Sequence, residues 1–174
     1  MSLSKPDNPN LLHPNKFRLK FDRLPNLEFF CQDIALPGIT SNSVVRPTPF
    51  VDLPSPGDKL VFDPLVVSIL VDEDLNTWKE LHRWIRDFTF PTTFEEYQDL
   101  KNIATGHIRD GFYQFSDANL TLLSSSNNPV VSFKFADIYP ESVDTLQLST
   151  KMSPDDVLVV NVVFRYSYFT IESL

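Results

Sequence analysis

The sequence has a single cysteine, Cys31, and only four glycines among its 174 residues. One cysteine excludes a disulfide within the chain, and the neighbouring Phe29 and Phe30 indicate a packed thiol rather than a reactive one. Four scattered glycines are too few for a phosphate-binding loop. No apolar run approaches the roughly 20 residues of a membrane-spanning helix, and none follows the polar start as in a signal peptide, so we expect no membrane anchor.

Spacings typical of catalytic or metal sites are also missing. The run from Asp72 to Asn76 imitates the start of a calcium loop, but Thr77 stands where glycine is needed and Arg83 where glutamate is needed. No Cys/His cluster has zinc spacing. The three histidines are scattered: His13, His82 and His107. We therefore expect no metal, no cofactor and no enzymatic activity.

Basic residues are outnumbered by acidic ones, 15 to 23, which gives a formal net charge of −8. Affinity for nucleic acid comes mainly from Lys and Arg that neutralise phosphates, so this composition argues against a DNA-binding protein. It is compatible with a surface that lets DNA pass without sticking. The plainer interpretation is a protein kept soluble by like charge.

Alternating apolar residues predict a mainly β fold with a minor α contribution. Phe17, Leu19 and Phe21 begin the pattern, and we expect residues 27–32 to return beside them as a hairpin. In all, we predict an antiparallel β-barrel or sandwich of about seven strands. Residues 1–15, which three prolines interrupt, are predicted to form a flexible N-terminal arm, and residues 16–174 a single domain.

The longest alternating run spans Val157 to Phe169, and we predict it as one strand that crosses a whole sheet. The even-numbered residues from Leu158 to Tyr168 fall on one face and are expected to pack on the core. The other face is partly polar, because it carries Asn161, Arg165 and Ser167.

One flanking helix is predicted near residues 73–88. Its start is marked by Asp72, Glu73 and Asp74, which suit a helix N-terminus through capping and the macrodipole. Apolar residues follow at helical spacing. They are Leu75, Trp78, Leu81, Ile85 and Phe88, with His82 beside them. A capping box at Thr92 or Thr93 predicts a short second helix near residues 93–100.

Residues 44–62 are the least regular stretch and hold four prolines among exposed apolar residues. Two interpretations remain open: a loop folded onto its own domain, or an arm that docks on a neighbouring subunit.

The order of several motifs resembles the tail tube proteins of contractile-tailed, T4-like bacteriophages. These motifs are the Leu36-Pro37-Gly38-Ile39 turn, the acid-capped helix with Trp78 and Trp84, and the segment from Tyr139-Pro140 to Leu146-Gln147-Leu148 before the last strand. The resemblance covers residues 14–171. It implies that residues 16–174 form a tail-tube β-barrel domain.

The resemblance also implies a function. The chain would be a structural virion protein, assembled in the host bacterial cytoplasm, whose hexameric rings stack into the inner conduit for double-stranded DNA. Its partners would be copies of itself, the tail sheath protein, baseplate and tail terminator proteins, and the tape measure protein. Alternatives are a tube initiator or terminator of the tail or baseplate, the inner-tube protein of a bacterial contractile injection system, or a small β-rich enzyme or binding domain.

Two sets of residues follow as candidate sites. The candidate interface between rings or subunits consists of Phe50, Val51, Leu53, Pro54 and Pro56. The candidate strand facing the lumen or a neighbour carries Asn161, Arg165 and Ser167.

Overall fold

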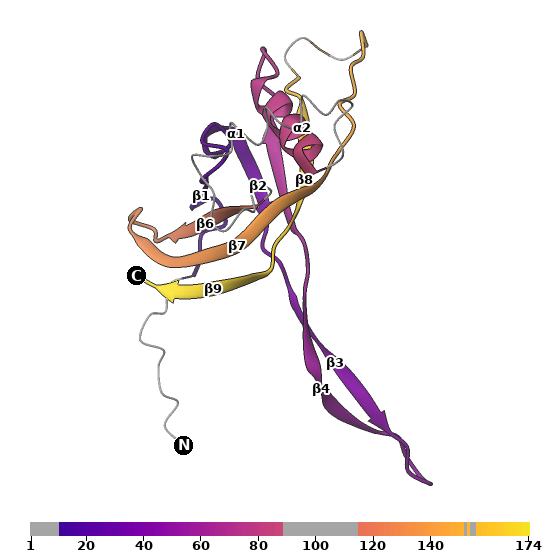
Figure 1. Cartoon of the computed structure of the whole chain (residues 1–174). Helices are drawn as coiled ribbons and strands as arrows, with labels where there is room; N and C mark the ends of the chain where they lie inside the picture. Colours follow the sequence, from indigo (N-terminus) through magenta and orange to yellow (C-terminus); the bar gives the residue numbers. More distant parts are fainter. Residues whose placement is uncertain (1–10, 89–114, 152, 154–155) are drawn as a thin grey trace.

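The computed structural model describes residues 11–88, 115–151, 153 and 156–174. Figure 1 shows the elements in space. In chain order they are β1 (Phe17–Phe21), α1 (Leu27–Phe30), β2 (Cys31–Ala35), β3 (Ile39–Arg46), β4 (Leu53–Phe62), β5 (Leu65–Leu70), α2 (Asn76–Phe88), β6 (Ser116–Leu123), β7 (Pro129–Val143), β8 (Val159–Arg165) and β9 (Tyr168–Ser173). The prediction of a mainly β, antiparallel fold is confirmed.

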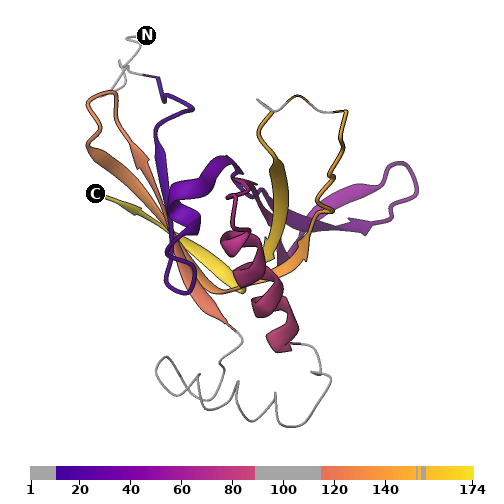
Figure 2. The same cartoon turned by 90° about the horizontal axis from the view of Figure 1, so that it is seen from above.

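A seven-stranded antiparallel sheet forms the body, in the order β1-β6-β7-β8-β5-β2, with β9 paired to β7. The 15-residue β7 joins two halves: its first part pairs with β6 and β9, and its last part pairs with β8. Figure 2 shows the two halves turned toward each other with α2 between them. The body is therefore sandwich-like, and within the described residues the path from β1 to β2 does not close.

Alternation along the strands builds one core. Leu65, Val67 and Ile69 on β5 are fully buried, and their side chains meet those of Val160, Val162 and other buried residues of β8. Phe164 lies at the centre, with its ring centroid 4.9 Å from that of Phe21 and 6.3 Å from that of Trp84. Burial of these side chains supplies the main stabilisation of the sheet.

The helix α2 begins at Asn76, three residues later than predicted, and the predicted acidic cap is confirmed. The carboxylate of Asp72 accepts hydrogen bonds from the backbone N–H groups of Asn76 (2.8 Å) and Thr77 (3.1 Å). The delay reflects a turn before the helix, in which Leu75 adopts a φ of 56°. The buried face of the helix also differs from the predicted stripe, because it includes Thr77 and Trp84 while His82 is exposed.

We expect Asp72→Ala to lower the free energy of unfolding by about 1 kcal/mol, because it leaves two N–H groups of the first turn without an acceptor. Asp72→Asn keeps one acceptor oxygen, so its free energy of unfolding is expected to lie between those of the wild type and Asp72→Ala. Urea denaturation measures the difference.

The effect of Asp72 should also depend on pH. Burial opposes the charged form, but the backbone hydrogen bonds from Asn76 and Thr77 outweigh it and lower the pKa of Asp72 from its ordinary value of 3.8. The stabilisation is therefore complete above 3.8 and is lost as the pH falls through the lowered pKa of the folded state. If the wild type and Asp72→Ala differed in free energy of unfolding by as much in strong acid as at neutral pH, this pH dependence would be contradicted.

Two predicted strand arrangements are wrong. Residues 27–30 form α1, and β1 pairs with β6 rather than with the returning segment. The helical turn buries Leu27 and leaves Phe29 83% exposed, whereas a strand would place both on one face.

The predicted final strand is also wrong, because it is two strands, β8 and β9, separated at Tyr166 and Ser167. The N–H of Ser167 bonds the carbonyl of Ala136, where the chain passes from one half of β7 to the other. The alternating pattern hides this break because each strand keeps its own two faces. The predicted helix near 93–100 lies outside the described residues, as does most of the predicted arm over 1–15.

Candidate assembly surface

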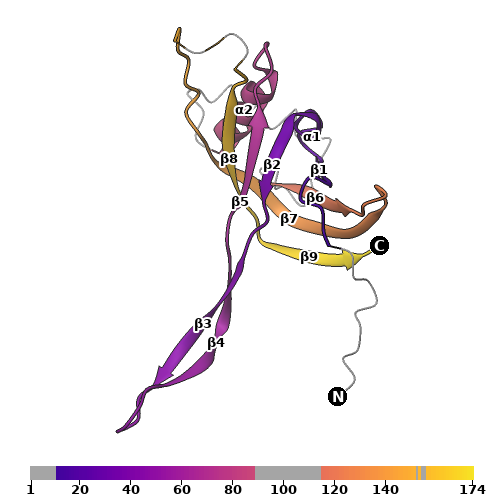
Figure 3. The ribbon, with the colours of Figure 1, turned by 180° about the vertical axis from the view of Figure 1, so that it is seen from behind.

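A long hairpin, residues 39–62, stands away from the body (Figures 1 and 3). It is formed by β3 and β4, which make a separate two-stranded sheet. Every residue of β3 is exposed. The interpretation of this stretch as a loop folded onto its own domain is therefore wrong, and its shape is that of an arm.

The hairpin exposes apolar side chains along its length. At its tip, residues 47–52, Phe50 is 94% exposed. The other exposed large hydrophobic residues of the hairpin are Ile39, Val44, Val45, Val51, Leu53, Leu60 and Val61. An isolated two-stranded hairpin is marginally stable in water, and a contiguous apolar patch marks an interaction site.

The tip is closed on itself by one threonine. The hydroxyl of Thr48 donates to the carbonyl of Val51 and accepts from the Val51 N–H, the latter at 3.2 Å. Pro47 and Pro49 further restrict the backbone of this turn. Phe50 is thus presented by a turn with little freedom to fold back.

Two prolines remove hydrogen-bond donors from the outer edge of β4. Val45 is paired with Pro54, and Ser43 with Pro56. Because proline has no N–H, these must be the non-hydrogen-bonded pairs of the ladder, with the proline nitrogens facing away from β3. An added strand would find no donors at these positions, so β4 is protected from edge-to-edge pairing.

We expect the double variant Pro54→Ala, Pro56→Ala to associate non-specifically, because it restores two outward N–H groups. Two further hydrogen bonds are worth about 2 kcal/mol, so the concentration at which light scattering begins should fall roughly thirtyfold. Thioflavin fluorescence would report the strand pairing. Pro49→Ala, outside the ladder, serves as the matched control, and equal behaviour of the two variants would contradict the protective role.

A bulge divides the hairpin into a base and an outer part. Between the pairs Ser41–Leu60 and Ser43–Pro56 the register shifts, so that Asn42 faces the stretch that begins at Gly57. A Cβ at Gly57 would lie 2.5 Å from the carbonyl oxygen of Asn42, so only glycine fits.

An aromatic cluster fixes the base of the hairpin to the body. The ring of Phe62 lies 5.9 Å from that of Tyr166 and 5.5 Å from that of Phe169. The Tyr166 hydroxyl donates to the carbonyl of Asp63 at 2.8 Å. Burial and the nearby Asp63 carboxylate raise the pKa of Tyr166 to about 12, so this donor keeps its proton at neutral pH. The break between β8 and β9 is therefore also the anchor of the hairpin.

A row of polar side chains crosses the sheet on the face away from the core. It consists of Asp33 on β2, Ser68 on β5, Asn161 on β8 and Asp144 after β7, which neighbouring strands place side by side. The Ser68 hydroxyl donates to the Asn161 amide oxygen (2.7 Å), and the Asn161 amide donates to Asp144 (3.0 Å). We call these four residues the polar row.

The three polar residues predicted on the last strand are all exposed. Asn161 and Arg165 lie on the same exposed face of β8, while Ser167 is exposed in the break before β9. Arg165 is paired with Glu141 at 2.7 Å, and this carboxylate raises the pKa of Arg165. Sequence reasoning missed Ser68, although its place between Val67 and Ile69 on an alternating strand was a usable signal.

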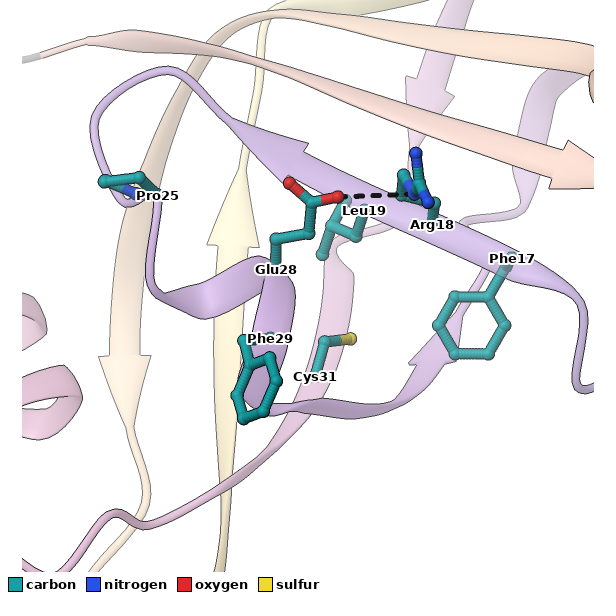
Figure 4. A pocket seen from close by; sticks show the side chains of 7 residues that line it. All are labelled: Phe17, Arg18, Leu19, Pro25, Glu28, Phe29 and Cys31. Atoms are coloured by element: carbon teal, nitrogen blue, oxygen red, sulfur yellow. Dashed lines mark ion pairs between the residues drawn. The ribbon is translucent and has the colours of Figure 1, made fainter.

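An open pocket of about 490 Å³ lies between β1, α1 and β2 (Figure 4). Its floor includes the buried Leu19, and Arg18 and Glu28 form an ion pair of 3.3 Å at its rim. Figure 4 shows Cys31 between the rings of Phe17 and Phe29. Burial, aided by the nearby Asp33, raises the pKa of Cys31 to about 12, so this thiol is a packing group rather than a nucleophile.

Among the residues that the structure describes, no group of three or more His, Cys, Asp or Glu is arranged to hold a metal ion. None of the helices described has both the length and the apolar character to span a membrane.

The chain is similar in sequence to known proteins of phage tails. The sequence model of the family described as phage tail tube protein matches residues 12–172. The chain is 24% identical over 145 residues to the tail tube terminator protein of Enterobacteria phage T4, which covers 81% of this chain and 76% of that protein.

Solved structures share the fold. A chain in the cryo-EM structure of the anti-feeding prophage cap, the tube-terminating cap, has a TM-score of 0.58 and 12% identity and covers 100% of this chain and 95% of that one. A chain in the sheath–tube complex of the extracellular contractile injection system PVC, in its extended state, has a TM-score of 0.55 and 9% identity over 95% of this chain and 94% of that one.

Proposed function

The chain belongs to the phage tail tube protein family, and from this premise we propose that it is a ring-forming tail protein that ends the tube, in the position of a terminator. Membership makes it a structural tail component, related to structural proteins rather than to enzymes. The observation that carries the terminator role is its similarity to the T4 tail tube terminator over most of both chains.

The role of repeating tube subunit is the second candidate. It is favoured by the description of the matching family, and the fold does not decide the matter, because chains from a terminating cap and from a sheath–tube complex have almost the same TM-scores, 0.58 and 0.55. The two roles differ physically. Head-to-tail contacts along an axis propagate without end, so a protein that ends a tube must have one ring face that does not match the other.

We propose further that six copies close into a ring, that the polar row faces the conduit, and that the hairpin contacts a neighbour. Asp33 and Asp144 would then line the wall, and the charge of Arg165 would be neutralised by Glu141. Such a wall repels the DNA backbone, which suits passage rather than binding. The expected partners are the tail tube and sheath proteins at the tube end, with baseplate and tape measure proteins and double-stranded DNA as partners of the conduit. The setting would be a phage virion assembled in the bacterial cytoplasm, or the related injection machine.

Electron microscopy of the purified chain tests the role. We expect discrete six-fold rings that do not grow into tubes as the concentration rises, together with a ring mass by light scattering. Long tubes would overturn the terminator role in favour of the repeating subunit. A monomer at every concentration would overturn both.

A further inference from the structure

The pocket between β1, α1 and β2 is not needed for ending a tube. The surface that the hairpin tip contacts on its neighbour is the subject of the second proposal. We propose that this pocket receives the hairpin tip of a second copy of the chain, with Phe50 seated over Leu19 and Cys31. The inference rests on the proposed function, because it names the partner of the hairpin within the ring.

The contact must join two copies. The three views agree that the hairpin points away from α1 and β1, which contribute most of the residues that line the pocket. The tip therefore cannot reach the pocket of its own chain. A knob on one side and a hole on the other make a heterologous contact, the kind that builds rings when its rotation closes.

The tip and the pocket agree in size. Phe50 is 94% exposed on a turn closed by Thr48, so it is presented without a large loss of conformational freedom on docking. A cavity of about 150 Å³ accepts a benzene ring, and the pocket has about 490 Å³, enough for Phe50 and the backbone beside it. Phe29, at 83% exposed, offers an aromatic wall that otherwise faces water.

The charges agree as well. The tip is flanked by Arg46, at the end of β3, and Asp52, just before β4, and both are exposed. The pocket rim carries the exposed pair of Glu28 and Arg18. A seated tip can place Arg46 against Glu28 and Asp52 against Arg18, so that each charge beside the tip meets the opposite charge of the ion pair at the rim.

The position in the sheet gives an independent reason. β1 and β2 are the two ends of the sheet path, and in the described part of the chain their outer edges carry no paired strand. A tip seated between them covers both edges and the exposed Phe29 in one contact.

A photoreactive benzophenone amino acid at position 50 tests the seating directly, since it replaces one aromatic side chain with another. Illumination of the assembled chain should give cross-linked dimers, with the attachment mapped by mass spectrometry to residues 17–31. The same amino acid at Leu148, which is exposed and outside both surfaces, is the control and should not label that segment. Attachment elsewhere, or no cross-link, would overturn the inference.

The results separate this inference from the proposed role. Rings with cross-links outside residues 17–31 would overturn the receptor and leave the terminator role intact. Tubes with cross-links inside that segment would overturn the terminator role and support the receptor.

A charge exchange supplies a second measurement. Glu28→Arg and Arg46→Glu should each weaken assembly about tenfold. The double variant should recover part of the loss, because it restores the contact between positions 28 and 46 but not the ion pair of Glu28 with Arg18. Failure of the double variant to recover would overturn the seating of the tip in this orientation.

Discussion

A chain with Phe50→Ser, Val51→Ser and Leu53→Ser is expected to remain folded and to lose assembly by at least a hundredfold. All three side chains are exposed in the single chain, so their removal costs the fold little. At an interface, a few buried aromatic and aliphatic anchors carry most of the binding free energy, and a loss of about 2.7 kcal/mol corresponds to a hundredfold weaker association.

Sedimentation across a concentration series measures the assembly, and urea denaturation of the same samples verifies the fold. Leu148→Ser is the matched control, because Leu148 is also exposed and apolar but lies outside the hairpin. If the triple variant assembled like the control, the hairpin would have no part in subunit contacts.

The second large effect concerns the core. We expect Phe164→Ala to lower the free energy of unfolding by about 3–5 kcal/mol, since Phe164 is fully buried between Phe21 and Trp84. A domain is usually stable by only about 5–15 kcal/mol, so the variant should be close to unfolding at physiological temperature.

Urea denaturation provides the measurement for this variant. Val159→Ala lies on the same strand at a largely exposed position, and we expect its unfolding free energy to change by less than about 0.5 kcal/mol. Similar losses for the two variants would show that β8 is not the centre of the core.

How far the sequence predicts this molecule depends on whether a feature is local. The cap at Asp72 follows from residues a few positions apart, and it is found in the structure. The apolar face of β8 was also predictable, because period two fixes which residues share a face.

Features that depend on distant partners were not predictable. The break at Tyr166 arises because β8 and β9 pair with different parts of β7, and single-strand periodicity carries no information on pairing. The four prolines of residues 44–62 argued against regular structure there. The structure tolerates Pro54 and Pro56 because both lie where an edge strand needs no N–H. The residues of the polar row other than Asn161 come from three separate segments, so only the fold brings them together.

The anchoring of the hairpin has a mechanical consequence. A load applied to the tip travels along β3 and β4 to Phe62, and from there to Tyr166 and Phe169. Phe169 is the second residue of β9, which is bonded along β7, so the load is spread over a whole ladder of hydrogen bonds instead of one flexible joint. Leu174 extends this ladder, because its N–H bonds the carbonyl of Val130 at 2.9 Å. In the proposed ring, tension between neighbouring subunits would therefore pass through the longest strand of each subunit.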